Sequence, residues 1–165
     1  NQEVRDRPFK RPLSLDMIIE YSSFAPKEPH DVLFEDTLLP LCSPKFEEKN
    51  ITSLQTLSKS HLIHLDAKET NWTSWTNWFV TLGFVGEVSV RHRVNNYSIA
   101  LQLAQDGMGV VLGWKKLVAP LIENGSLVPL TNYEIKAPGK FYLIRSNGNP
   151  KKYSKIFSDW LVLQK

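Results

Sequence analysis

The stretch that decides the fold runs from residue 95 to residue 114, and its sequence is Asn-Asn-Tyr-Ser-Ile-Ala-Leu-Gln-Leu-Ala-Gln-Asp-Gly-Met-Gly-Val-Val-Leu-Gly-Trp. Its polar start can cap a helix, because Asn95, Asn96 or Ser98 can accept hydrogen bonds from the first free N–H groups. Apolar residues then recur at helical spacing from Ile99 to Ala104. We therefore expect a capped helix in the first half of this stretch.

Two glycines are expected to end this helix and begin a strand. Gly107 can stop the helix, because a left-handed backbone costs glycine least. Gly109 can let the chain turn directly into the short buried strand Val110–Leu112. A helix whose first N–H groups point outward can bind a carboxylate or phosphate. The stretch is therefore a candidate ligand-binding corner, and it contains no metal cluster or acid–base pair.

The order of cap, helix, Ala-x-x-Gly-x-Gly and Val-rich strand resembles the effector-binding domain of LysR-type transcriptional regulators. Three other segments resemble motifs of that family in the same order, namely Leu15–Tyr21, Leu38–Pro44 and Ile156–Leu161. The pair Trp72 and Trp75, with Leu82-Gly83-Phe84, resembles the glycine-cleavage-activator branch. Together these segments cover nearly the whole chain.

Strands alternating with helical segments predict an α/β fold with largely parallel sheets. Two long extended segments, 33–43 and 134–145, are natural places for the chain to leave one lobe and return. We expect an incomplete subdomain I of residues 1–40 plus 140–165, and a subdomain II of residues 41–139. The resemblance implies the same layout, which is periplasmic-binding-protein-like: two small α/β subdomains joined by two crossover strands, with a ligand cleft between them. The family's first strand and helix, which precede the Leu15–Tyr21 strand, are absent from this sequence.

Two further helices follow from apolar spacing. Trp75, Trp78, Phe79 and Leu82 recur at helical spacing, with Gly83 as the stop. The last helix is expected to present one apolar face, formed by Tyr153, Ile156, Phe157, Trp160 and Leu161. Because they lie on such stripes, Trp75, Trp78 and Trp160 are expected in the core.

The composition is that of an ordinary globular protein, with 42% hydrophobic and 22% charged residues among 165. No apolar run is long enough to span a bilayer. The single cysteine, Cys42, excludes an intramolecular disulfide, and with the polar N-terminus it indicates a cytoplasmic protein. The net charge of +3 is scattered, so we expect contact with DNA only through a domain outside this chain.

The candidates for catalysis are weak. Cys42 and the histidines are not linked by a known spacing, and a small buried core cysteine is favoured. The pair His61 and His64 lies at a strand with no cysteine pair, which disfavours zinc. Gly107-x-Gly109 follows a helix and precedes a strand, the reverse of a dinucleotide fingerprint. We therefore expect no enzyme activity, no metal and no cofactor.

The candidate ligand residues come from two arguments. Trp114 ends a strand, where ligands of sheets usually bind, and can equally be a core residue. Ser22 and Ser23 follow a predicted buried strand, and either bind a ligand or form a turn. The family resemblance implies an effector site bordered by six residues: Ser22, Ser23, Leu41, Asn96, Tyr97 and Ser98.

The first hypothesis is a ligand-sensing regulatory domain of a bacterial LysR-type regulator. A small metabolite, with a carboxylate as the favoured class, would bind between the lobes and signal to a separate winged helix-turn-helix domain. The resemblance implies dimers, and a sheet edge left exposed by the absent first strand favours self-association. A stand-alone periplasmic-type solute-binding protein is the alternative hypothesis, and a small α/β enzyme is the third.

Overall fold

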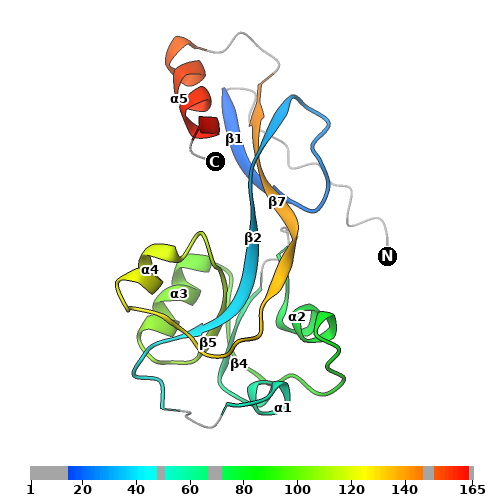
Figure 1. Cartoon of the computed structure of the whole chain (residues 1–165), viewed down its shortest axis with the longest axis vertical. Coiled ribbons are helices and arrows are strands. Elements are labelled where there is room, and N and C mark those ends of the chain that lie inside the picture. The colour runs from blue at the N-terminus through cyan, green and yellow to red at the C-terminus, as the bar shows by residue number, and fades with distance from the viewer. Residues whose placement is uncertain (1–14, 48–50, 67–71, 147–150, 164–165) are drawn as a thin grey trace. The chain divides into compact units, whose positions relative to one another are not determined.

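The computed structural model describes residues 15–47, 51–66, 72–146 and 151–163. Along the chain it contains (Figure 1) β1 (Met17–Ser22), β2 (His30–Cys42), α1 (Leu54–Leu57), β3 (Leu62–Leu65), α2 (Trp75–Thr81), β4 (Val90–Val94), α3 (Tyr97–Gln105), β5 (Val110–Trp114), α4 (Ala119–Glu123), β6 (Val128–Pro129), β7 (Ile135–Arg145) and α5 (Lys152–Leu163). The strand order is β1-β7-β2-β5-β3-β4, with β6 paired to β2.

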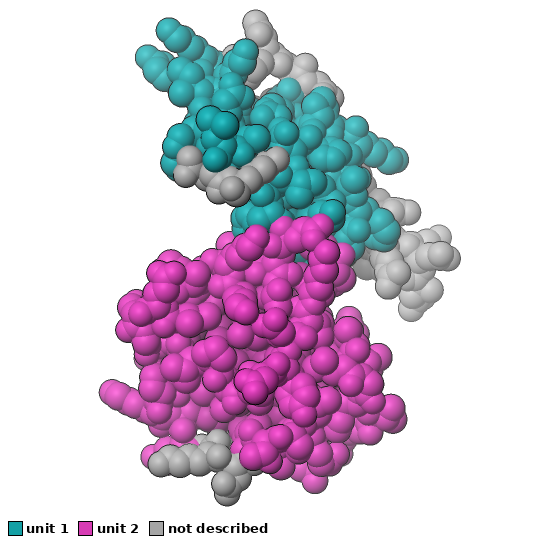
Figure 2. All heavy atoms as spheres, in the orientation of Figure 1, with its two compact units in different colours: residues 1–34, 140–165 teal, residues 35–139 magenta. Residues whose placement is uncertain are grey.

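The chain divides into two compact units, which Figure 2 shows in different colours. Unit 1 is Asn1–Phe34 with Lys140–Lys165, and unit 2 is Glu35–Gly139. The chain therefore passes from one unit to the other within the long strand β2 and returns within the long strand β7. The first boundary therefore lies earlier on β2 than the 40/41 boundary expected from the sequence.

Unit 1 is built on the antiparallel pair of β1 and the second half of β7. Met17 lies opposite Arg145, and Ser22 lies opposite Lys140. The ring of Phe141 packs against Tyr21 and Phe34, with ring centroids 5.1 and 4.6 Å apart. Aromatic contacts of this kind stabilise strand pairs.

Unit 2 is a mixed sheet with helices beside it. β3 runs parallel to both β4 and β5, whereas β5 and β6 pair antiparallel with β2. The expectation of largely parallel sheets is therefore correct only around β3. The connections through α2 and α3 make β3, β4 and β5 run in the same direction. The link from β2 to β3 holds only the four-residue α1, and β3 runs in the direction opposite to β2.

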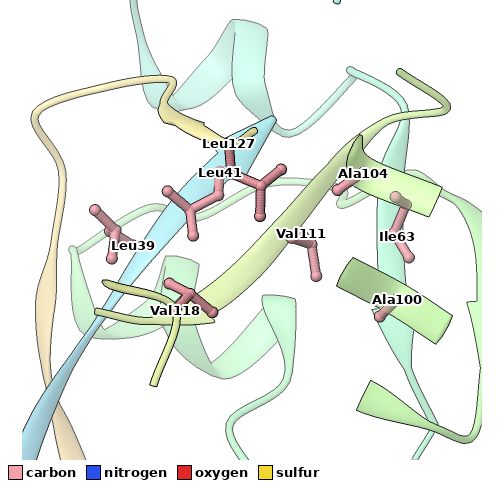
Figure 3. Close-up of a cluster of buried hydrophobic side chains, with 8 residues drawn as sticks. All are labelled: Leu39, Leu41, Ile63, Ala100, Ala104, Val111, Val118 and Leu127. Atoms are coloured by element: carbon pink, nitrogen blue, oxygen red, sulfur yellow. The ribbon is translucent and has the colours of Figure 1, made fainter. Parts of the chain in front are cut away.

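The core of unit 2 lies between its strands and α3. Figure 3 shows eight buried side chains that pack together: Leu39, Leu41, Ile63, Ala100, Ala104, Val111, Val118 and Leu127. Each large aliphatic side chain removed from water here contributes about 1.5–3 kcal/mol. The two alanines allow α3 to lie close to the strands.

Helix α2 supplies the aromatic part of the core, as its spacing predicts. Trp75, Trp78 and Phe79 are buried, and the indole N–H groups of the two tryptophans donate to the carbonyl oxygens of Ile63 and Leu38 at 2.9 and 3.2 Å. These hydrogen bonds satisfy the only polar atoms of the buried indoles.

Helix α5 differs from its prediction. Tyr153 and Trp160 are 81% and 52% exposed, and Ser158 is the buried residue of the helix. The expected core position of Trp160 is therefore wrong in this structure. Helical spacing identifies an apolar stripe but not what covers it. The contact of α5 with the rest of unit 1 is instead partly polar, because Ser154 Oγ donates to the carboxylate of Asp16.

The glycines of the 95–114 stretch play different parts. Gly107 has φ +78°, which confirms the left-handed helix stop. Gly109 is not among the residues of positive φ, so a special turn is not its reason. A Cβ at this position would lie 2.2 Å from the carbonyl oxygen of His61. Gly109 is needed because two backbones approach closely.

Candidate functional site

The first element of the candidate site is the N-terminus of α3. Asn96 is its N-cap, and its Oδ1 accepts from the N–H groups of Ser98 and Ile99 at 2.9 and 3.3 Å. The cap side chain therefore occupies donors that an anion would need. The structure gives no support to a carboxylate ligand at this helix end.

The second element joins α3 to the end of β5. The N–H of Trp114 donates to the hydroxyl oxygen of Tyr97 at 3.1 Å. Burial, together with the negative charge of Asp36, raises the pKa of Tyr97 and outweighs the opposing effect of the Trp114 hydrogen bond. The phenol is therefore neutral at physiological pH.

Three aromatic rings meet where the start of α3 approaches the end of β5, and together they form the aromatic corner. Trp72, Tyr97 and Trp114 have ring centroids 4.6 to 5.1 Å apart and are all in edge-to-face contact. Trp114 is only 3% exposed, so it forms the inner wall of the corner. Edge-to-face pairs at these distances are favourable beyond their buried area.

A buried acid fixes the turn that follows β5. Asp36 is 4% exposed, and both of its carboxylate oxygens accept from the N–H of Lys116, at 3.0 and 3.1 Å. Oδ1 also accepts from the N–H of Thr37 at 2.7 Å. Asp36 was not predicted from the sequence, although a carboxylate among the apolar residues of the long extended segment 33–43 was an available signal.

A small cavity lies beside the aromatic corner. Its volume is about 20 Å³, and its lining comprises Ile63, His64, Leu65, Trp72, Thr73, Trp75, Val111, Leu112 and Trp114. A cavity of this volume holds about one water molecule. Thr73 Oγ1 is buried without a hydrogen-bond partner in the described part of the chain. Burial lowers the pKa of His64, an effect that Arg93 strengthens and Asp66 opposes.

A larger, polar hollow of about 450 Å³ lies along β2 and β7. It is lined by Glu35, Asp36, Thr37, Lys116, Glu134, Ile135 and Lys136. Its charges are already matched in part, since Lys136 pairs with Glu35 at 2.5 Å and Glu134 pairs with Lys115 at 3.1 Å. The hollow is large enough for a metabolite, and none of its lining residues was predicted from the sequence as a site residue.

The structure gathers part of the predicted site. Asn96, Tyr97 and Ser98 meet Trp114 in unit 2, through α3 and the Tyr97 hydrogen bond. Leu41 is fully buried in the core, so its side chain can only shape the site from within. Ser22 and Ser23 belong to unit 1, where Ser22 Oγ accepts from the N–H of Phe24 at 3.1 Å and forms a turn.

Cys42 has the surroundings of a core residue. It is buried, which confirms the expectation from sequence, and burial raises its pKa to about 11. Such a thiol stays protonated and is a poor nucleophile. Within the described ranges, no group of three or more His, Cys, Asp or Glu side chains could hold a metal ion.

Comparison with known families identifies the class of protein. The family model described as the LysR substrate binding domain matches residues 14–163, so the chain belongs to this family. The chain is thus a ligand-sensing regulatory domain with the periplasmic-binding-protein-like fold of LysR effector-binding domains. No curated protein matches it significantly. No helix in the described residues is long and apolar enough to cross a membrane.

Solved structures share this fold. The effector domain of the regulator AmpR from Pseudomonas aeruginosa is 22% identical, with a TM-score of 0.73 over 90% of this chain and 71% of that one. The AmpR effector-binding domain from Citrobacter freundii is 23% identical, with a TM-score of 0.73 over 91% and 74%. The regulatory domain of HypT from Salmonella typhimurium is 21% identical, with a TM-score of 0.64 over 88% and 70%. Against full-length HypT, the chain covers 52% of that protein.

Proposed function

We propose that this chain senses a small-molecule effector and passes the signal to a separate winged helix-turn-helix DNA-binding domain of a bacterial LysR-type regulator. Membership of the LysR family favours this function over a stand-alone solute-binding protein. The proposal includes a cytoplasmic location, self-association and no catalytic step.

The observation that supports the site is the hydrogen bond from the Trp114 N–H to Tyr97. It joins the start of α3 to the carboxyl end of β5, and ligands of α/β sheets bind at carboxyl ends of strands. The exposed Ser98 lies beside it, at the second position of α3.

The proposed roles follow from exposure. Asn96, Tyr97 and Ser98 supply polar atoms to the effector from unit 2, while Leu41 and Trp114 shape the wall from the interior. Ser22 and Ser23 supply hydroxyls from unit 1. An effector shifts a conformational equilibrium of the chain toward the state that it binds best.

The test replaces Ser98 with leucine in the complete regulator and measures effector-dependent expression from a reporter promoter. The matched control is Thr76→Leu, because Thr76 is exposed at the second position of α2, as Ser98 is at that of α3. We expect Ser98→Leu to abolish the response and Thr76→Leu to preserve it. An unchanged response with Ser98→Leu would show that the effector binds elsewhere and that Asn96 only caps a helix.

A further inference from the structure

The aromatic corner has no room for a metabolite while Trp72, Tyr97 and Trp114 are all in place. The adjoining cavity of about 20 Å³ accepts one water at most. A ligand that enters between these three rings must therefore displace a side chain, and the rings differ in how firmly they are held.

Two of the three rings are anchored. Tyr97 begins α3, and its hydroxyl oxygen accepts from the backbone of Trp114. Trp114 ends β5 and is almost fully buried. Displacing either ring would break a strand end or a helix start.

Trp72 is held less firmly. It lies outside any helix or strand and is half-buried, and no hydrogen bond of its indole N–H is found among the described residues. Its neighbour Trp75, by contrast, donates to the carbonyl of Ile63 and is buried. Its ring contacts with Tyr97 and Trp114, together with its buried area, keep Trp72 in place.

The space that Trp72 fills adjoins a buried hydroxyl group that has no hydrogen-bond partner in the described chain. Trp72 and Thr73 line the same cavity, and Thr73 Oγ1 is buried there without a hydrogen-bond partner in the described chain. A buried hydroxyl without a hydrogen-bond partner is destabilising, and a ligand that bonds to it removes that cost.

We propose that Trp72 is a displaceable plug, and that the corner takes a small planar aromatic molecule carrying a hydrogen-bonding group in its place. The ring of the ligand packs on Tyr97 and Trp114, and its polar group meets Thr73 Oγ1. This inference rests on the proposed function and names the chemical class of the effector for that site.

The experiment titrates the whole chain with indole and, separately, with phenol. It follows the melting temperature with both probes and the tryptophan emission with phenol alone, because indole itself fluoresces like tryptophan. Cyclohexanol is the matched probe that has a hydroxyl but no aromatic ring. We expect indole and phenol to raise the melting temperature and phenol to change the tryptophan emission, and cyclohexanol to do neither.

Two variants locate the probe. Trp72→Ala removes the plug and should tighten probe binding at least tenfold, whereas Thr73→Val removes the hydroxyl and should weaken binding severalfold. Equal affinity in the wild type and Trp72→Ala, or binding to Trp72→Ala alone, would overturn the proposal. Equal stabilisation by cyclohexanol would overturn the aromatic class. The Ser98→Leu reporter assay is independent of these probes, so failure here is distinguishable from failure of the proposed function.

Discussion

At the scale of single residues, Asp36 shows how a buried charge is accommodated. A carboxylate removed from water is costly unless hydrogen bonds replace its hydration. The backbone N–H groups of Thr37 and Lys116 supply these bonds. Because Lys116 follows Trp114 by two positions, the same bonds hold the turn beside the candidate site.

Replacing Asp36 with asparagine should therefore lower stability. Asparagine keeps the shape but loses the charge and one acceptor oxygen, so we expect the free energy of unfolding to fall by about 1–3 kcal/mol. Urea denaturation measures this change. The matched control is Glu35→Gln, the neighbouring residue in a partly exposed ion pair with Lys136, which should cost less than about 1 kcal/mol. Equal costs would contradict the role given to Asp36.

The thiol of Cys42 should be unreactive in the folded chain. With a pKa raised from 9.0 to about 11, the thiolate fraction at pH 8 falls from about 10% to about 0.1%. In the folded chain the labelling rate with a disulfide reagent should keep rising with pH toward pH 11, whereas in the unfolded chain it should level off above pH 9. Equal labelling rates at pH 8 before and after unfolding in guanidinium would contradict this prediction.

At the scale of elements, α3 and β5 form one continuous unit, in which Gly107 ends the helix and Gly109 permits the strand. The N–H of Val110 donates to the carbonyl of His61 at 2.8 Å. A side chain at Gly109 would meet that same carbonyl oxygen. The pairing of β5 with β3 therefore requires glycine, which has no side chain, at position 109.

Gly109→Ala should disturb this pairing. We expect a loss of about 1–3 kcal/mol, typical of overpacking, with faster hydrogen exchange at the Val110 amide. Gly107→Ala is the control. A Cβ at position 107 would meet nothing within 4 Å, but the alanine would have to adopt the glycine's φ of +78°. It should cost about 1–2 kcal/mol and leave the protection of Val110 unchanged. Normal Val110 protection in Gly109→Ala would refute the close-approach argument.

At the scale of the whole molecule, the chain exposes one apolar helix face. Tyr153, Ile156, Phe157, Trp160 and Leu163 are all exposed on α5. Phe157 and Trp160 stack with ring centroids 5.8 Å apart. Exposed apolar stripes of this kind favour association.

We expect the chain to self-associate, with a weight-average mass that rises with concentration in light scattering. Replacing Phe157 and Trp160 together with serine should lower that mass, because it removes the centre of the apolar stripe. The control replaces Val80 and Val85, exposed apolar residues of unit 2, with serine. This control should change the weight-average mass little. A monomer at every concentration would disprove the prediction.

The chain alone should not select a DNA sequence, since its net charge is only +3 and is dispersed. Any binding should be equal for unrelated duplexes and should collapse as salt is added. Fluorescence anisotropy at low and physiological salt measures both properties. Tight, sequence-selective binding at physiological salt would contradict the assignment of DNA recognition to a separate domain.

The sequence by itself determined that a helix follows the polar start at residues 95–98, with Asn96 as one of three possible caps, and that Gly107 ends it, because such signals lie within a few neighbouring residues. The polar start of the candidate site was predictable for the same reason. The family resemblance came from four motifs in the same order along the chain. Only the tertiary structure decided that Asp36 binds a backbone N–H 80 positions away, or that Trp78 donates to Leu38. It likewise decided which face of α5 is covered. Such contacts join strands and helices that are distant along the chain, and local periodicity does not specify which distant elements pack together.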